Sequence, residues 1–182
     1  MRNCFQFQNL SVLGHGIAVM RKARLLYKEE LSGFVLPEWF KENIGLIKNN
    51  LYDWKIIKRY TLWHDCGKPY CRTVDESGKQ HFPDHAKKSG IIFLENVSRD
   101  IEIANLISND MVFHTVKADE LQSLLANTLG KREAFTLLLV AFAELHANAE
   151  MFGGTDNVSF KIKWKQLDKR GKQVLTYFKE GN

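Results

Sequence analysis

The sequence predicts an all-α fold: a helical bundle with one short β-hairpin or flap, in a single domain that spans residues 1–182. Most segments repeat apolar residues at the three- and four-residue spacing of an amphipathic helix. Residues 70–82 are the exception, because two short runs flank the turn-forming sequence Asp75-Glu76-Ser77-Gly78. A chain of 182 residues is long enough to bury one sizeable core.

The composition is that of an ordinary globular protein, with 45% hydrophobic and 26% charged residues. No apolar run approaches the ~20 residues that a membrane span needs, and the N-terminus lacks an apolar signal core. The three cysteines form no disulfide framework, so we expect a cytoplasmic protein that does not act at a membrane. The net charge of +5, concentrated near the C-terminus, favours anionic partners.

The first helix is expected over residues 9–31, with Ser11 as its N-cap. Gly14 and Gly16 flank His15 inside it, and each glycine costs roughly 1 kcal/mol relative to alanine. Such a cost indicates either that another part of the molecule approaches this helix closely or that the helix is locally irregular.

The remaining pattern predicts a series of further helices. They are expected over residues 37–50, 53–65, 85–95, 98–114, 119–129 and 134–151. The run 158–164 alternates like a strand, but we expect it to open a last helix that ends near residue 178.

The chemically most informative stretch is His64-Asp65-Cys66-Gly67-Lys68-Pro69, at the end of the expected helix 53–65. Gly67 and Pro69 are predicted to end that helix, with Gly67 in the left-handed conformation. A neutral imidazole beside a carboxylate can bind a divalent cation with little strain. Lys68 adds a positive charge where a phosphate oxygen could bind.

The other histidines are spread along the chain at positions 15, 81, 85, 114 and 146. His85 is expected on the first turn of a helix that Asp84 caps. His114 closes a later helix, where the helix dipole by itself also favours a histidine. His81 lies on the predicted flap and is equally well explained as a surface residue.

The order of these residues resembles the HD-domain superfamily of metal-dependent phosphohydrolases. The pattern of that family is a His, then His-Asp, then optional further His residues, then a distant Asp. The runs 64–69 and Phe82-Pro83-Asp84-His85-Ala86-Lys87-Lys88-Ser89 are most similar to the HD domains of CCA-adding enzymes, which read roughly HDxGKP and FxGHxxxS. The resemblance extends from His15 to about residue 152, and it implies an HD-type bundle.

The resemblance also implies a metal centre held by His15, His64, Asp65 and a late acidic residue. The late position matches Asn148, whose amide oxygen can ligate a hard cation but adds no charge. A weaker site, a shifted ligand such as His146 or Glu144, and an inactive form of the family all remain open.

Two further histidines, His85 and His114, resemble those that bind a second metal ion in some family members; they could instead contact phosphate. Imidazole-rich ligation does not distinguish among Mn, Fe, Co, Ni, Zn and Mg.

The expected function is hydrolysis of a nucleotide or a related phosphate ester by a metal-activated water. Asp65 and Lys68 are the catalytic candidates, and Arg72, Lys161 and Lys163 are the candidates for binding the anionic substrate. The sequence does not determine the oligomeric state.

Two alternatives stay open. One is an HD-type nuclease on single-stranded nucleic acid, for which Phe160, Trp164 and Tyr177 among the basic C-terminal residues could stack on bases. The other is a catalytically silent nucleotide-binding module, which the uncharged Asn148 favours.

Overall fold

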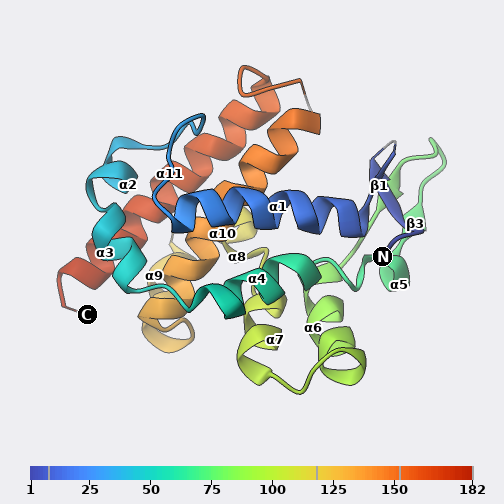
Figure 1. Cartoon of the computed structure of the whole chain (residues 1–182), viewed down its shortest axis with the longest axis horizontal. Coiled ribbons are helices and arrows are strands. Elements are labelled where there is room, and N and C mark those ends of the chain that lie inside the picture. The colour runs from blue at the N-terminus through green and yellow to red at the C-terminus, as the bar shows by residue number, and fades with distance from the viewer. Residues whose placement is uncertain (8, 118, 152, 182) are drawn as a thin grey trace.

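The computed structural model describes residues 1–7, 9–117, 119–151 and 153–181, and the fold is mostly α-helical as predicted (Figure 1). Its long helices are α1 (Val12–Tyr27), α10 (Lys131–Met151) and α11 (Val158–Lys179). α10 packs against both α1 and α11, and α1 also packs against α4 (Trp54–Trp63). In Figure 1, α1 crosses in front of α10, with α11 behind and above.

The core is centred on α10, the most apolar segment of the chain. Residues 134–143 of this helix are all buried, so the helix is surrounded on every side over that stretch. Burial of this kind explains why the sequence there shows no polar face.

Shorter helices complete the bundle. They are α2 (Glu38–Glu42), α3 (Ile44–Asn49), α5 (Lys68–Cys71), α6 (His85–Asn96), α7 (Ile101–Ser108), α8 (Val112–Thr115) and α9 (Glu120–Asn127). α6 packs against α5 and α7, and α8 packs against α10 and α11. None of the helices in these described ranges combines the length and the apolar character that a membrane span requires.

The predicted hairpin is confirmed as β3 (Thr73–Val74) paired antiparallel with β4 (Gln80–His81). Asp75 holds its turn together, because its carboxylate accepts hydrogen bonds from the backbone N–H groups of Ser77 and Lys79. The same carboxylate lies 2.7 Å from His81 Nε2, so His81 belongs to the hairpin itself. A second small ribbon, β1 (Phe5–Phe7) with β2 (Leu10–Ser11), was not expected.

Several helix boundaries differ from the sequence expectation for local reasons. The Ser11 cap is confirmed, since its hydroxyl accepts from Gly14 N–H at 3.1 Å, but α1 is shorter than 9–31. The expected helix 37–50 breaks at Asn43, whose side-chain amide donates to the Trp39 carbonyl at 2.6 Å. Such a side-chain bond competes with the helical backbone pattern. The expected helix 98–114 is divided into α7 and α8.

Candidate metal centre

Close contact between α1 and the end of α4 brings His15 to the His-Asp pair. A Cβ at position 16 would lie 2.9 Å from the carbonyl oxygen of Leu62 and 3.2 Å from that of Thr61. Gly16 therefore allows an approach that any side chain would prevent. As a result the rings of His15 and His64 lie with their centroids 5.2 Å apart, and both are buried. The close approach that the glycines predicted is confirmed at Gly16.

The turn that carries His64 and Asp65 follows directly on α4 and is held by α6. Gly67 N–H donates to Ser89 Oγ at 2.8 Å, and a Cβ on Gly67 would lie 2.5 Å from the backbone nitrogen of Ser89. Gly67 has right-handed dihedral angles of −79° and −19°, so the prediction of a left-handed residue is wrong. The glycine is needed here because two backbones meet. Pro69 lies at the beginning of α5, where proline is accepted.

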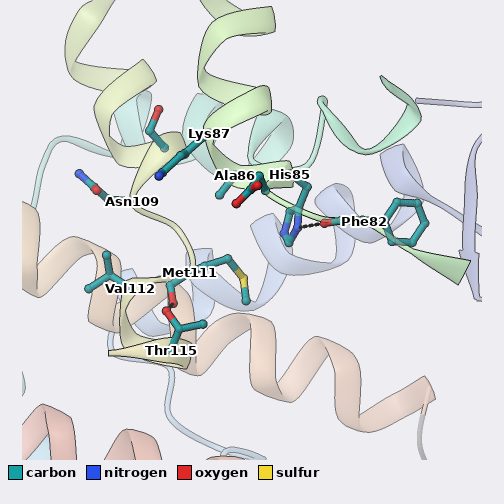
Figure 2. Close-up of a pocket in the computed structure, with 10 residues that line it drawn as sticks. Phe82, His85, Ala86, Lys87, Asn109, Met111, Val112 and Thr115 are labelled. Carbon is teal, nitrogen blue, oxygen red and sulfur yellow. Dashed lines mark hydrogen bonds between the residues drawn. The ribbon is translucent and has the colours of Figure 1, made fainter. Parts of the chain in front are cut away.

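Backbone carbonyls orient two of the imidazoles. His64 Nδ1 lies 2.7 Å from the carbonyl oxygen of Thr61, and His85 Nδ1 lies 2.9 Å from that of Phe82 (Figure 2). A carbonyl only accepts, so Nδ1 carries the proton in each neutral ring and Nε2 keeps its lone pair. Backbone partners of this kind commonly stand behind metal-ligating histidines. The free ring ends converge on Asp65, with His64 Nε2 3.4 Å from Oδ2 and His85 Nε2 3.5 Å from Oδ1.

α10 contributes Glu144 to the same cluster. Its Oε1 lies 3.5 Å from His15 Nε2, and its Oε2 lies 3.2 Å from His114 Nε2. His15, His64 and Glu144 each offer one ligand atom, and these atoms all lie within 4.8 Å of one another. Two imidazole nitrogens and a carboxylate oxygen at this separation could hold one metal ion.

The cluster concentrates buried polar atoms that make no hydrogen bond within the described ranges. They are Nδ1 and Nε2 of His15, Nε2 of His64, Oδ1 of Asp65, Oδ2 of Asp110 and Nε2 of His114. Buried polar atoms in proteins are normally paired. Their convergence from α1, the His-Asp turn and the α7–α8 segment indicates a site shaped to receive a cation or a polar ligand.

The electrostatics of the cluster are dominated by buried carboxylates. Burial lowers the pKa of His64, but Asp65 and Asp110 outweigh burial and raise that pKa to about 10. Burial also opposes the ionised form of Asp65, yet His64 and Lys68 hold the pKa of Asp65 far below its ordinary value. The pKa of Glu144 is likewise lowered, against burial, by its contacts with His114 and His15. Asp65 and Glu144 thus stay ionised in spite of burial because positively charged side chains surround them.

Lys68 supplies part of that charge. Its ammonium lies 2.6 Å from Asp65 Oδ2 and 5.5 Å from the centre of the Phe82 ring. Burial lowers the pKa of Lys68, but the attraction of Asp65 raises it overall, so the side chain stays charged. A role for Lys68 in binding phosphate stays a prediction; in the structure its ammonium is paired with the Asp65 carboxylate.

Asp110 is an additional member of the cluster, placed between α7 and α8. It is buried, and Tyr60 O–H donates to its Oδ1. Burial raises the pKa of Asp110, while the charge of His64 lowers it. The carboxyl group therefore lies close enough to His64 to influence the centre.

Of the two late α10 residues, Glu144 is the one that the structure shows in contact with the histidines. Glu144, one helical turn before Asn148, makes the contacts with the histidines, whereas Asn148 is half-buried on the same face. A metal role for Asn148 stays a prediction. His146 is excluded as the shifted ligand, because its Nε2 accepts from Val35 N–H at 3.0 Å and its Nδ1 bonds the Phe142 carbonyl.

The candidate anion-binding residues fall in separate places. Lys163 lies close enough to His114 for its charge to lower the pKa of that imidazole, although Glu144 raises it overall against burial. Lys161 is exposed and lies 3.5 Å from Asp156. Arg72 is exposed at the end of α5, before the hairpin. Of these three candidates, Lys163 is the one whose charge acts on a histidine of the cluster.

The aromatic residues of α11 mostly serve packing. Phe160 is buried against the His146 ring, and the indole N–H of Trp164 donates to the Val35 carbonyl at 2.7 Å. Tyr177 packs against the Phe178 ring. These contacts weaken the case for a base-stacking surface on this helix.

A pocket opens beside the cluster. Its volume is ≈ 430 Å³, and His85 forms part of its wall together with residues of the α7–α8 segment (Figure 2). The imidazole that faces Asp65 thus also faces this space.

Comparison of the chain with protein-family models, curated proteins and solved structures finds no significant match.

Sequence reasoning missed Asp110 and favoured Asn148 over Glu144 as the acidic position. Asp110 stands beside Asn109 between two helices, so no periodicity marks it as buried. For Glu144 a signal did exist, since it shares a helix face with Asn148 and carries the charge that the other lacks.

Proposed function

We propose that this chain is a metal-dependent phosphohydrolase of the HD-domain type that acts on a nucleotide or a related phosphate ester. One observation carries the proposal: His15, His64 and Glu144 converge within 4.8 Å, beside Asp65 and with unpaired buried nitrogens. The donors come from segments far apart in the sequence: His15 and His64 follow the HD pattern, and Glu144 takes the late acidic place one turn before the position that the resemblance assigns. An all-helical fold agrees with that resemblance but is shared by many unrelated proteins.

A first cation would be held by His15, His64, Asp65 and Glu144. Because buried anions are unfavourable without compensation, a divalent cation would replace the protons that now balance these carboxylates. Such a cation lowers the pKa of a bound water and polarises a phosphoryl oxygen. Nothing in the donor set selects one metal among Mn, Fe, Co, Ni, Zn and Mg.

The remaining groups would act on the phosphate. His85 Nε2 lies 3.5 Å from Asp65 Oδ1 and His114 Nε2 lies 3.2 Å from Glu144 Oε2, so these histidines could hold a second cation or donate to phosphate oxygens. Lys68 keeps Asp65 ionised and oriented, and Lys163 adds positive charge near His114. Fixed positive charge of this kind favours the charge that develops as the phosphate ester is cleaved.

The contacts of Glu144 weaken the hypothesis of a catalytically silent module. It depended on Asn148 bringing no charge to the centre. Glu144 supplies a carboxylate one turn earlier, in contact with His15 and His114.

The decisive experiment combines metal analysis with hydrolysis. Purified protein, stripped with a chelator and reloaded, should retain stoichiometric metal and hydrolyse at least one substrate among mononucleotides, cyclic nucleotides, dinucleoside triphosphates and short oligonucleotides. His64→Ala and Asp65→Ala should lose both properties while circular dichroism remains helical. Turnover that survives in either variant would exclude the proposed centre.

A matched pair of variants locates the acidic ligand. Glu144→Gln keeps the size of the side chain and removes its charge, and it should abolish metal retention. Asn148→Ala should leave metal retention largely unchanged. If Asn148→Ala lost the metal and Glu144→Gln retained it, Asn148 would be the ligand.

A further inference from the structure

The pocket beside His85 has the dimensions of a small-ligand site. Its volume of ≈ 430 Å³ lies within the range of roughly 300–1,000 Å³ that is usual for such sites. A nucleoside is small enough to enter it. His85 forms part of the pocket wall, and its Nε2 lies 3.5 Å from Asp65 Oδ1. A ligand in the pocket would therefore have its near end at the candidate metal centre.

The walls combine apolar surface with a few polar groups. Met111 and Val112 form one side, and Figure 2 shows Lys87 across the pocket from them. Asn109 and Thr115 add hydrogen-bonding groups on the wall that the α7–α8 segment forms. The lining mixes apolar side chains with a few polar ones, and the carboxylate of Asp84 disfavours a bare anion, so the pocket suits a nucleobase better than a phosphate.

Asn109 has a fixed orientation. Its Nδ2 donates to Glu133 Oε1 at 3.0 Å, and a carboxylate accepts but does not donate. Glu133 accepts one of the two amide hydrogens and so holds the amide in one orientation, which leaves the amide oxygen free to accept a hydrogen bond from a ligand. An acceptor at this position favours a base with an N–H donor over one that presents a carbonyl.

We propose that this pocket binds the nucleoside part of the substrate, with Asn109 accepting a hydrogen bond from an exocyclic amino group of the base. The phosphate would lie near His85; its placement and the role of the nucleoside as part of a substrate rest on the proposed function, whereas nucleoside binding itself does not. Asn109 would thus determine specificity, and the preferred substrates would be nucleotides whose base carries an amino group.

Binding of uncharged nucleosides can be measured without a metal ion and without turnover, so it tests the pocket alone. The four methionines can be labelled with ¹³C at their methyl groups, and Met111 is the one in the pocket wall. In chelator-stripped protein, adenosine and cytidine at millimolar concentration should shift the Met111 methyl signal. Met1, Met20 and Met151 should keep their signals. The Met111 methyl signal is assigned as the one that disappears from the spectrum of Met111→Leu.

Two matched comparisons sharpen the result. Adenosine differs from inosine, and cytidine from uridine, by an amino group in place of a carbonyl, and each amino form should bind about tenfold more tightly. Thr115→Trp, at the exposed rim, should fill the pocket and weaken binding at least tenfold, whereas Ser123→Trp on the surface of α9 should not.

A Met111 signal that does not respond to any nucleoside would overturn the proposal, as would binding that Thr115→Trp leaves intact. Equal binding of adenosine and inosine would refute the role of Asn109. Loss of metal in His64→Ala tests the hydrolase separately, so failure of one proposal does not imply failure of the other.

Discussion

Replacing Gly67 with alanine should separate the His-Asp turn from α6. The added Cβ would lie 2.5 Å from the backbone nitrogen of Ser89, and a helix backbone cannot yield as a flexible side chain can. Overpacking of this kind costs ~1–3 kcal/mol. The displacement also breaks the 2.8 Å hydrogen bond from Gly67 N–H to Ser89 Oγ. A buried N–H left unpaired adds ~1–3 kcal/mol, so we expect a total loss of about 2–6 kcal/mol.

Urea unfolding at constant m-value measures this loss directly. In a thermal scan the midpoint should fall by at least about 4 °C for a chain of this size. Ser89→Ala removes the acceptor without adding bulk, and it should cost about 1–3 kcal/mol. The double variant should cost less than the sum, because both changes remove the same hydrogen bond.

The matched control is Gly45→Ala, in α3. A Cβ there would meet nothing within 4 Å, so this variant should gain about 0.5–1 kcal/mol from helix propensity. If Gly67→Ala were as stable as the wild type, the close contact between the turn and α6 would be refuted. If Gly45→Ala lost as much stability as Gly67→Ala, the cause would not be the steric contact at Ser89.

Three further predictions follow from single contacts. Gly16→Ala should lower both stability and metal retention, because its Cβ would lie 2.9 Å from the Leu62 carbonyl oxygen and push His15 away; unchanged metal retention would contradict this. Asp84→Gly should stabilise the protein by up to about 1 kcal/mol in urea unfolding, since Asp84 has a positive φ of 51° and makes no side-chain cap; Asp84→Ala should not. Burial lowers the pKa of His146, so the unfolded chain binds this proton more readily, and stability is lost as the pH falls below about 6.5. The cost of His146→Gln in metal-free protein should accordingly be greatest near pH 7.5 and shrink toward pH 5.5; a cost independent of pH would refute it.

Local sequence was sufficient where a structure depends on near neighbours. The cap at Ser11, the hairpin after the His-Asp turn and the helical character of residues 158–179 are all observed. It was insufficient where one residue had two physical explanations. Gly67 could end a helix or admit a close neighbour, and only the position of Ser89 distinguishes the two.

The sequence by itself determined that the protein is helical and that His64 and Asp65 lie side by side, because periodicity and adjacency are properties of the chain. Only the tertiary structure decided which residues join them. Glu144 and Asn148 share a helix face about 6 Å apart along the axis, and the spacing alone does not tell which of them meets the histidines; the structure shows Glu144 3.5 Å from His15. The packing of α10 against α1 sets that axial position, and Asp110 likewise enters the cluster because α7 and Tyr60 place it there. Contacts between segments so far apart along the chain have no signature in the spacing of either segment.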